Sequence, residues 1–439
     1  MLKAMQNPVF RRLFAAQALA LVGTGLATVA LGLLAFRIAG ADAGLILGTA
    51  LAIKMVAYVT LSPVAAAVAS RLPRRSVLVG LDLTRAGVVA FLPFVTEVWQ
   101  IYVLIFLLQA ASAAFTPAFQ ATIPDLFPDE RDYTSALALM RLTEDMEQIV
   151  SPLLAAALLT LVSFPVLFGG TVAGFAVSAA FVLTAALPPR PVAPAERFLT
   201  EATKGIRVYL LTPRLRGAMA LEFAVAAAGA MIYVNTVVFV QGRFGLGEPQ
   251  VALAFAAFGG GSMMAALVLP RILPATGDRA AMLGGAALML VAVAASGAAA
   301  GLAGLMLLWA LVGFGFALTQ IPIGRILTRS AAPADRPAVF AAQFALSHAA
   351  WLVAYPLAGW LGAADGLGRA ALVLAVLGAV AFVCAMRLWP PDDPEVVPHV
   401  HPDLAAGHPH LGAGETGHAH AFVIDALHPR WPRRSDRAA

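Results

Sequence analysis

The chain has 439 residues, of which 60% are hydrophobic and only 12% are charged. Soluble proteins carry about 25% charged residues, so this composition excludes a single soluble core, and disorder of most of the chain is excluded by the high hydrophobicity. The apolar runs are continuous and about twenty residues long, whereas a β-barrel would show alternating segments of about ten. We therefore predict an all-α polytopic membrane protein.

The net charge of +5 does not indicate a nucleic-acid partner, because Lys and Arg lie in small groups between apolar runs, as membrane topology requires. Cys384 is the single cysteine, which excludes a disulfide within the chain and a thiolate metal cluster. The apolar stretch from Leu13 to Phe36 is too long for a signal-peptide core, so we interpret it as a retained first span.

Twelve apolar segments are long enough to cross a hydrocarbon layer about 30 Å thick. They lie at 13–36, 43–69, 77–95, 98–123, 135–162, 166–187, 217–240, 250–270, 280–298, 301–324, 338–362 and 370–389.

Polar segments divide the chain into four parts. Residues 1–187 and 217–389 are predicted to form two six-helix bundles. Between them, 188–216 opens with PPRPVAPAE and continues as a predicted amphipathic helix. After Pro390 the sequence is polar and Pro-rich, and 390–439 is predicted to be a disordered, His-rich tail.

The orientation follows from the basic residues between the spans. If the N-terminus is cytoplasmic, almost all Lys and Arg of the connecting segments face the cytoplasm, and only Arg37, Arg243 and Arg369 lie outside. We therefore predict that both termini are cytoplasmic in a bacterial inner membrane.

The layout resembles the major facilitator superfamily. Residues 66–75, AAVASRLPRR, are similar to its loop signature of Gly, three residues, Asp-Arg, one residue and Gly-Arg-Arg. Arg71, Arg74 and Arg75 match the signature, whereas Ala66, Ser70 and Pro73 replace its glycines and aspartate. A faint repeat, Gly277-Asp278-Arg279, follows in the second half. The resemblance implies two bundles around a central cavity, acting as a monomer without a cofactor.

Two branches of the superfamily are similar to parts of the chain. Residues 115–128, FTPAFQATIPDLFP, resemble macrolide-type efflux proteins. Residues 341–362, an acidic fifth span and the His-rich tail resemble bacterial nickel-resistance exporters. Drug exporters often carry Gly-Pro-x-x-Gly-Gly in the fifth span, and here residues 151–156 read SPLLAA, which favours a cation.

Charged residues inside spans are the candidate transport site, because a charge at mid-bilayer costs about 2.5–3.5 kcal/mol on insertion scales. The candidates for cation binding and proton coupling are Lys54, Glu144, Asp145, Glu147, Glu222 and His348. Carboxylates and imidazole bind divalent first-row cations and also compete for protons.

Structural explanations remain open for several of these residues. Arg141 and Asp145 are spaced as an intrahelical ion pair, and Asp82 with Arg85 is expected to pair near the inner surface. Lys54 is a candidate partner of a fifth-span carboxylate, and His348 is equally consistent with a packed, hydrogen-bonded side chain.

Seven of the eight histidines lie in the tail. Three His-x-His pairs are followed by a single histidine, giving His399, His401, His408, His410, His418, His420 and His428. Residues two apart diverge by about 200° on a helix but project to one side of an extended chain. Prolines at 398, 402 and 409 favour extended backbone, so the tail is predicted to bind metal.

Three functions compete. The first is a secondary transporter that exports Ni²⁺, with Co²⁺ as a second candidate, in exchange for protons. The second is proton-coupled efflux of an amphipathic, macrolide-like drug, with the tail incidental. The third is a membrane-anchored metal sensor or store. The sequence contains no phosphate-binding loop and no nucleophile–base pair, so it predicts no enzyme.

Overall fold

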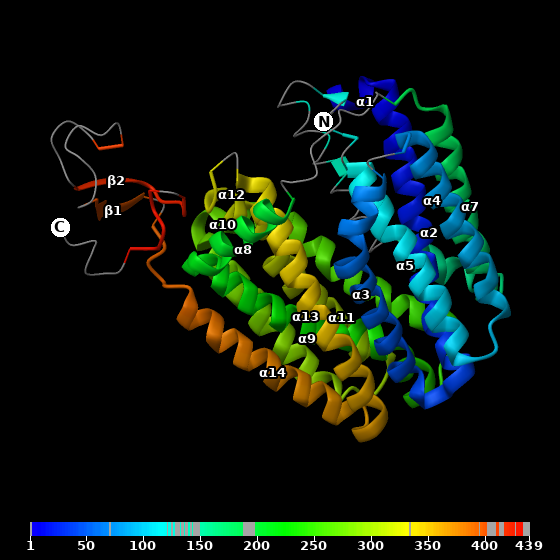
Figure 1. The fold of residues 1–439 in the computed structure, drawn as a ribbon. Coiled ribbons are helices and arrows are strands. Elements are labelled where there is room, and N and C mark those ends of the chain that lie inside the picture. The colour runs from blue at the N-terminus through cyan, green and yellow to red at the C-terminus, as the bar shows by residue number, and fades with distance from the viewer. Residues whose placement is uncertain are drawn as a thin grey trace.

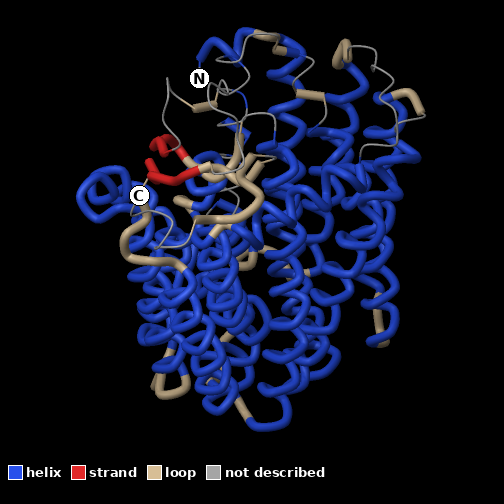
Figure 2. The backbone as a smooth tube through the Cα atoms, turned by 60° about the vertical axis from the view of Figure 1, so that its left-hand side comes forward, coloured by secondary structure: helices blue, strands red, loops and turns tan. Residues whose placement is uncertain are grey.

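The computed structural model of the protein describes residues 2–69, 72–120, 122–123, 126–127, 132, 136, 139–140, 143, 150–187, 198–332, 335–394, 396–401, 410–411, 417–425 and 427–432. Long helices run side by side along one axis, and one pair of strands lies at one end of the bundle (Figure 2).

The first half contains five long helices among the described residues. After the short α1 (Leu2–Gln6) come α2 (Pro8–Ala39), α3 (Ala43–Ala69), α4 (Arg74–Phe91), α5 (Val98–Gln120) and α7 (Pro165–Thr184). These helices match the predicted spans one to four and six. Of the predicted fifth span, the described residues 136, 139–140, 143 and 150–158 are helical.

The second half begins with the predicted amphipathic helix, α8 (Phe198–Leu211). It continues with α9 (Pro213–Val237), α10 (Glu248–Ser296), α11 (Leu302–Gln320), α12 (Ile323–Arg329), α13 (Arg336–Asp365) and α14 (Leu367–Leu388). Helix α10 contains two predicted spans that meet at Gly277, whose φ of 75° interrupts the helix. A glycine adopts this conformation without the steric cost that a Cβ atom would add.

Local sequence signals fix the helix starts. The Asn7 side chain accepts hydrogen bonds from the backbone N–H groups of Val9 and Phe10, at 3.0 and 3.2 Å, and so caps α2. Pro165 and Pro213 begin α7 and α9, because the fixed φ of proline suits the first helical turn.

The outer surface of the bundle suits a bilayer. Among the described residues, ten segments are long and apolar enough to cross a membrane, and the first of them, Pro8–Leu61, covers both α2 and α3. Large side chains such as Phe94, Leu161 and Val291 are exposed by 78%, 83% and 68%. Lipid rather than water covers such surfaces in a helical membrane protein.

The segments predicted to be cytoplasmic gather at one end of the molecule. The N-terminus, α8, α12 and the strand pair of the tail share this end in Figure 1. Arg75 reaches the carbonyl of Ala185 at 2.8 Å, and Arg12 reaches the carbonyl of Thr184. That this end faces the cytoplasm stays a prediction from the basic residues.

Asp82 and Arg85 form the expected ion pair on α4. Ser178 of α7 donates a second hydrogen bond to Asp82 at 2.7 Å, and the Arg85 guanidinium lies 3.9 Å from the ring centroid of Phe115. The pair therefore ties α4 to α7 and α5, which is a structural role.

The two bundles meet closely at the end opposite the termini, where α3 begins and α13 ends (Figure 1). A Cβ atom on Gly48 would overlap the carbonyl oxygen of Tyr355, and one on Gly359 would overlap that of Gly44. Asn235 of α9 donates a hydrogen bond to the carbonyl of Ala358 at 3.0 Å. Glycines therefore allow the backbones of α3 and α13 to touch, as small residues do in membrane helix packing.

This contact predicts opposite effects for two Gly→Ala substitutions. Gly359→Ala should lower the melting temperature of the detergent-solubilised protein by several degrees, because overpacking against backbone costs about 1–3 kcal/mol. Gly87→Ala on α4 is the control, because nothing lies within 4 Å of its new Cβ. It should leave the melting temperature unchanged or raise it, since alanine is the better helix former. Equal shifts for the two variants would contradict the close contact.

Candidate functional site

The tail forms a β-hairpin whose two strands carry three of its seven histidines. Strands β1 (Val396–Val400) and β2 (Gly417–Ala421) are antiparallel, and His399 pairs directly with His418. The described residues thus differ from the disordered tail that composition predicts. Val397, Phe422 and Ile424 are buried in the same hydrophobic core as the second bundle, which supplies the apolar burial that the tail lacks by itself.

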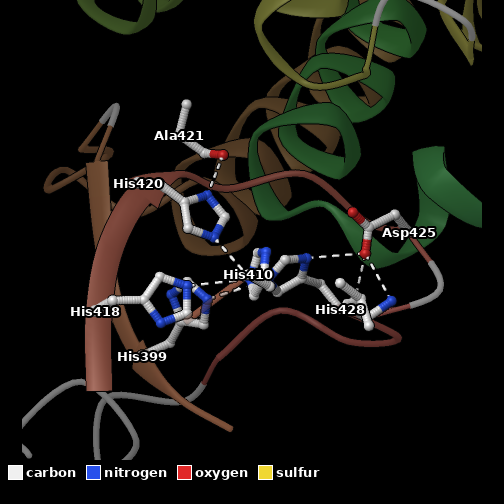
Figure 3. Close-up of polar contacts among 8 residues, drawn as sticks. His399, His410, His418, His420, Ala421, Asp425 and His428 are labelled. Atoms are coloured by element: carbon white, nitrogen blue, oxygen red, sulfur yellow. Dashed lines mark hydrogen bonds and ion pairs between the residues drawn. The ribbon is translucent and has the colours of Figure 1, made fainter. Parts of the chain in front are cut away.

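Six imidazoles converge beside the hairpin. His399, His410, His418, His420 and His428 surround one point in Figure 3, and the ring centroid of His401 lies 4.9 Å from that of His410. The Nε2 atom of His410 lies 3.2, 3.0 and 3.3 Å from those of His428, His418 and His420. The Nε2 atoms of His399 and His428 are 3.0 Å apart.

For three of these histidines, oxygen atoms fix which ring nitrogen faces inward. The Nδ1 atoms of His399 and His420 each lie 2.8 Å from a backbone carbonyl, of Val397 and Ala421 respectively. Nδ1 of His428 lies 2.8 Å from a carboxylate oxygen of Asp425. An oxygen acceptor requires a proton on Nδ1, which leaves the Nε2 lone pair for a ligand. This is how outer-shell oxygens orient metal-binding histidines.

The spacing of these lone pairs suits a transition-metal ion. Metal–nitrogen bonds of about 2.0–2.1 Å separate neighbouring ligand nitrogens by about 3.3–3.4 Å in a tetrahedron and about 2.8–3.0 Å in an octahedron. Two groups of four histidines have all their ligand atoms within 4.8 Å of one another. Imidazole donors favour nickel, zinc and copper over magnesium or calcium.

The imidazoles are poor proton acceptors in this arrangement. Burial, followed by the charge that neighbouring imidazoles would carry, lowers the pKa of His401 and of His418 to about 4. Burial likewise lowers the pKa of His399 and His428. At neutral pH these rings are therefore neutral, and an incoming cation displaces no proton from them.

Charged and aromatic residues fasten the tail to the second bundle. Asp393 accepts a hydrogen bond from Nε1 of Trp389 at 3.0 Å and forms ion pairs with Arg329 of α12 and Arg214 of α9, the latter at 3.7 Å. The Arg214 guanidinium also lies 4.9 Å from the ring centroid of Trp431. Segments before and after the histidine cluster thus contact the same arginine.

A cavity of about 420 Å³ lies between the two bundles. Its polar lining includes Lys54 and Gln109 from the first half. Aromatic side chains complete the wall, namely Tyr58, Tyr233, Phe255, Phe258, Trp351 and Tyr355. The Lys54 ammonium is 6.0 Å from the ring centroid of Tyr58. The cavity therefore combines a cation with an aromatic surface.

His348 stacks on Tyr58 of the cavity wall, with ring centroids 5.9 Å apart and planes at 16°. Its Nδ1 lies 2.7 Å from the carbonyl of Phe344, so Nε2 keeps the lone pair. The residue is thus both hydrogen-bonded, as the structural explanation expects, and able to bind a ligand.

Glu222 lies outside the cavity lining, in a hydrogen-bond network in the N-terminal half of α9. It is 3% exposed and accepts hydrogen bonds from Gln320 at 3.1 Å and Gln343 at 2.9 Å. Tyr209 of α8 donates to Gln343. Eleven residues of helix, about 16 Å, separate Glu222 from Tyr233 in the cavity wall. The network therefore links the central-loop helix to three helices of the second bundle.

Several predicted site residues lie outside the described residues: Arg71, Glu144, Asp145, Glu147 and His408. Of the loop signature, Arg74 is buried at the start of α4 and Arg75 bonds to the end of α7. The histidine pattern alone does not point to Asp425, Asp393 or Trp431. Asp425 lies three positions before His428, and this spacing was the available signal.

Comparison with known proteins agrees with this architecture. The Major Facilitator Superfamily matches residues 13–295 and 218–407. The chain belongs to this superfamily. It is also similar to an uncharacterized MFS-type transporter, YfiS, of Bacillus subtilis (strain 168), with 24% identity over 412 residues that cover 86% of this chain and 95% of that protein.

Solved transporters share the fold at low sequence identity. A mutant of the nucleoside transporter NupG has a TM-score of 0.69 at 16% identity, over 87% of this chain and 100% of the other. A bacterial homologue of the human lysosomal transporter Spinster, in an inward-facing conformation, has 0.68 at 14%, over 87% and 98%. A D-xylose–proton symporter has 0.65 at 13%, over 87% and 98%.

Membership confirms the predicted fold and excludes an enzyme. This superfamily member is a multi-pass secondary transporter that moves a small molecule or ion, and such transport is often coupled to protons.

Asp425 provides a test of the histidine geometry. Asp425→Ala should weaken metal binding by the full-length protein about 10–100-fold, as is typical for loss of a carboxylate behind a ligand histidine. The measurement is a competition titration against a chromophoric chelator. Asp365→Ala, at the far end of α13, is the control and should leave the affinity unchanged. Unchanged affinity in Asp425→Ala would contradict the assigned ring orientation.

Proposed function

We propose that this transporter exports a divalent cation, Ni²⁺ with Co²⁺ as a second candidate, from the cytoplasm in exchange for protons. The observation that carries the proposal is the convergence of six imidazoles, five of which have an Nε2 atom 3.0–3.3 Å from that of a neighbour, at one end of a secondary transporter. A cation that these ligands prefer is the simplest cargo for such a chain.

In this proposal the cation crosses the membrane through the cavity and along the fifth span. Pro152 lines the cavity. The same predicted span carries the carboxylates of Glu144 and Asp145. In this proposal they bind the cation, and Lys54 balances their charge when the cation is absent. Protons and the cation compete for these oxygens, and this competition couples their opposite movements.

Glu222 is the proposed proton site of the second bundle. Its two hydrogen-bond donors, Gln320 and Gln343, are neutral amides, which hold the carboxyl group in place whether or not it carries a proton. The hydrogen bonds through Gln343 connect this group to Tyr209, a buried residue of α8 at the predicted cytoplasmic end.

The decisive experiment is Ni²⁺ accumulation in a metal-sensitive bacterium. Expression of the full chain should lower cytoplasmic Ni²⁺ several-fold, and Glu144→Gln and Glu222→Gln should each restore the level of cells without the protein. Glu97→Gln is the control, because Glu97 is exposed between α4 and α5, and it should export like the parent chain. Unchanged Ni²⁺ and Co²⁺ levels with the full chain would overturn the proposal.

A chain that ends at Pro394 tests the role of the tail separately from that of the transport path. This chain keeps the Asp393 contacts and removes every tail histidine. If the tail only gathers ions, this chain should export normally at high Ni²⁺ and less than the full chain at low Ni²⁺. The measurement is the initial rate of export as a function of Ni²⁺ concentration in everted vesicles. Complete loss at all concentrations would make the tail part of the transport cycle.

The aromatic cavity specifically favours a second candidate, efflux of an amphipathic drug. Large ligands bind in mostly apolar pockets with a few polar groups, which describes this cavity well. Under this alternative the full chain should raise the inhibitory concentration of a macrolide several-fold. Trp351→Ala should reverse the effect by removing a wall of the cavity, whereas the chain ending at Pro394 should behave like the full chain.

A further inference from the structure

The histidine cluster offers two overlapping positions for one ion. The first group comprises His399, His410, His418 and His420, and the second comprises His399, His401, His410 and His428. Each group has four ligand atoms within 4.8 Å of one another, and His399 and His410 belong to both. Because each shared imidazole offers one lone pair, a single ion occupies one position or the other.

The two positions differ in access. His418 and His420, which belong to the first group alone, are partly exposed on β2. His428, which belongs to the second group, is 3% exposed, and Nε2 of His401 is buried without a hydrogen-bond partner among the described residues. A buried nitrogen that lacks a partner is costly unless a ligand uses it. We name the first group the outer position and the second the inner position.

The inner position has a ligand on the segment that contacts the membrane domain. His428 packs against Phe422, with ring centroids 4.6 Å apart, and Phe422 packs against Trp431 at 5.0 Å. Phe422 also contacts the shared His399, with ring centroids 4.9 Å apart, and His420 of the outer position at 6.4 Å. Among the described histidines, however, only His428 lies within residues 427–432, the segment that carries Trp431. Trp431 in turn lies 4.9 Å from the guanidinium of Arg214, which is 1% exposed at the start of α9. Helix α9 also carries Glu222 and reaches the cavity at Tyr233.

We propose that a divalent cation enters at the outer position, moves to the inner position, and there fixes His428 so that Trp431 is held against Arg214. Binding of the ion then holds the tail against the second bundle, so the tail does more than store ions. The inference rests on the proposed function for the identity of the ion alone, since the two positions and their connection to α9 follow from the contacts.

Three double variants test the two positions, each removing two histidines from the full-length protein. Co²⁺ is the probe of coordination, because its visible spectrum reports the ligands. His418→Ala/His420→Ala and His401→Ala/His428→Ala each leave one group of four intact, so both should bind one Co²⁺ per chain. His399→Ala/His410→Ala leaves only two ligands of each group and should lose tight binding.

Docking is measured separately with Zn²⁺, which has a filled d shell and does not quench fluorescence as Co²⁺ does. The accessibility of Trp431 to acrylamide is obtained by subtracting the signal of the matching Trp431→Phe protein. Zn²⁺ should reduce this accessibility several-fold in the parent chain and in His418→Ala/His420→Ala. It should have no effect in His401→Ala/His428→Ala, although that variant still binds the ion.

The outcomes separate this inference from the proposed function. Three results would each overturn the two-position site. The first is binding of two Co²⁺ per chain, and the second is tight binding by His399→Ala/His410→Ala. The third is an equal effect of Zn²⁺ on Trp431 in His418→Ala/His420→Ala and His401→Ala/His428→Ala. If these results hold but the full chain exports no metal, the inference stands and the proposed function fails. Size-exclusion elution identical to the parent chain verifies that each variant is folded.

Discussion

The lack of hydrogen-bonding solvent in the hydrocarbon layer is the constraint on which the structure depends. Every backbone polar group must therefore form its hydrogen bond within its own helix. Polar side chains must form hydrogen bonds or ion pairs with neighbouring side chains. Asp82 meets this demand with Arg85 and Ser178, and Glu222 meets it with two glutamines. The difference between these two sites is informative. A cation holds Asp82 in a structural pair, whereas neutral amides hold Glu222 and leave its protonation free to change.

The tail meets a different constraint, because a short polar segment cannot bury enough apolar surface to fold alone. It uses the core of the second bundle, against which Val397, Phe422 and Ile424 pack. Its centre consists of imidazole nitrogens 3.0–3.3 Å apart. A cation bound among them, as proposed, would therefore stabilise the fold of the hairpin, because metal binding is coupled to folding where the ligands come from different segments.

Much of the fold was predictable from the sequence, because apolar length and the positions of basic residues report directly on spans. The break at Gly277 and the amphipathic α8 had clear local signals as well. The folding of the tail was not predictable, since its order depends on contacts with Arg214 and Arg329, which lie far away in the chain. The spacing of the His-x-His pairs indicated extended backbone and metal binding. It gave no information on the pairing of His399 with His418 or on the role of Asp425.

The chemistry of the cavity and that of the tail indicate different ligands when each is considered alone. An aromatic wall with Lys54 suits an organic molecule, and a group of imidazoles suits a metal ion. Pro152 connects the cavity with the acidic residues of the fifth span. It lies in the cavity wall, and the same predicted span carries the acidic run RLTEDMEQ. A cation route depends on the carboxylates of that run, whereas a route for an organic molecule depends on the aromatic wall. The two candidate functions therefore depend on different residues of the same protein.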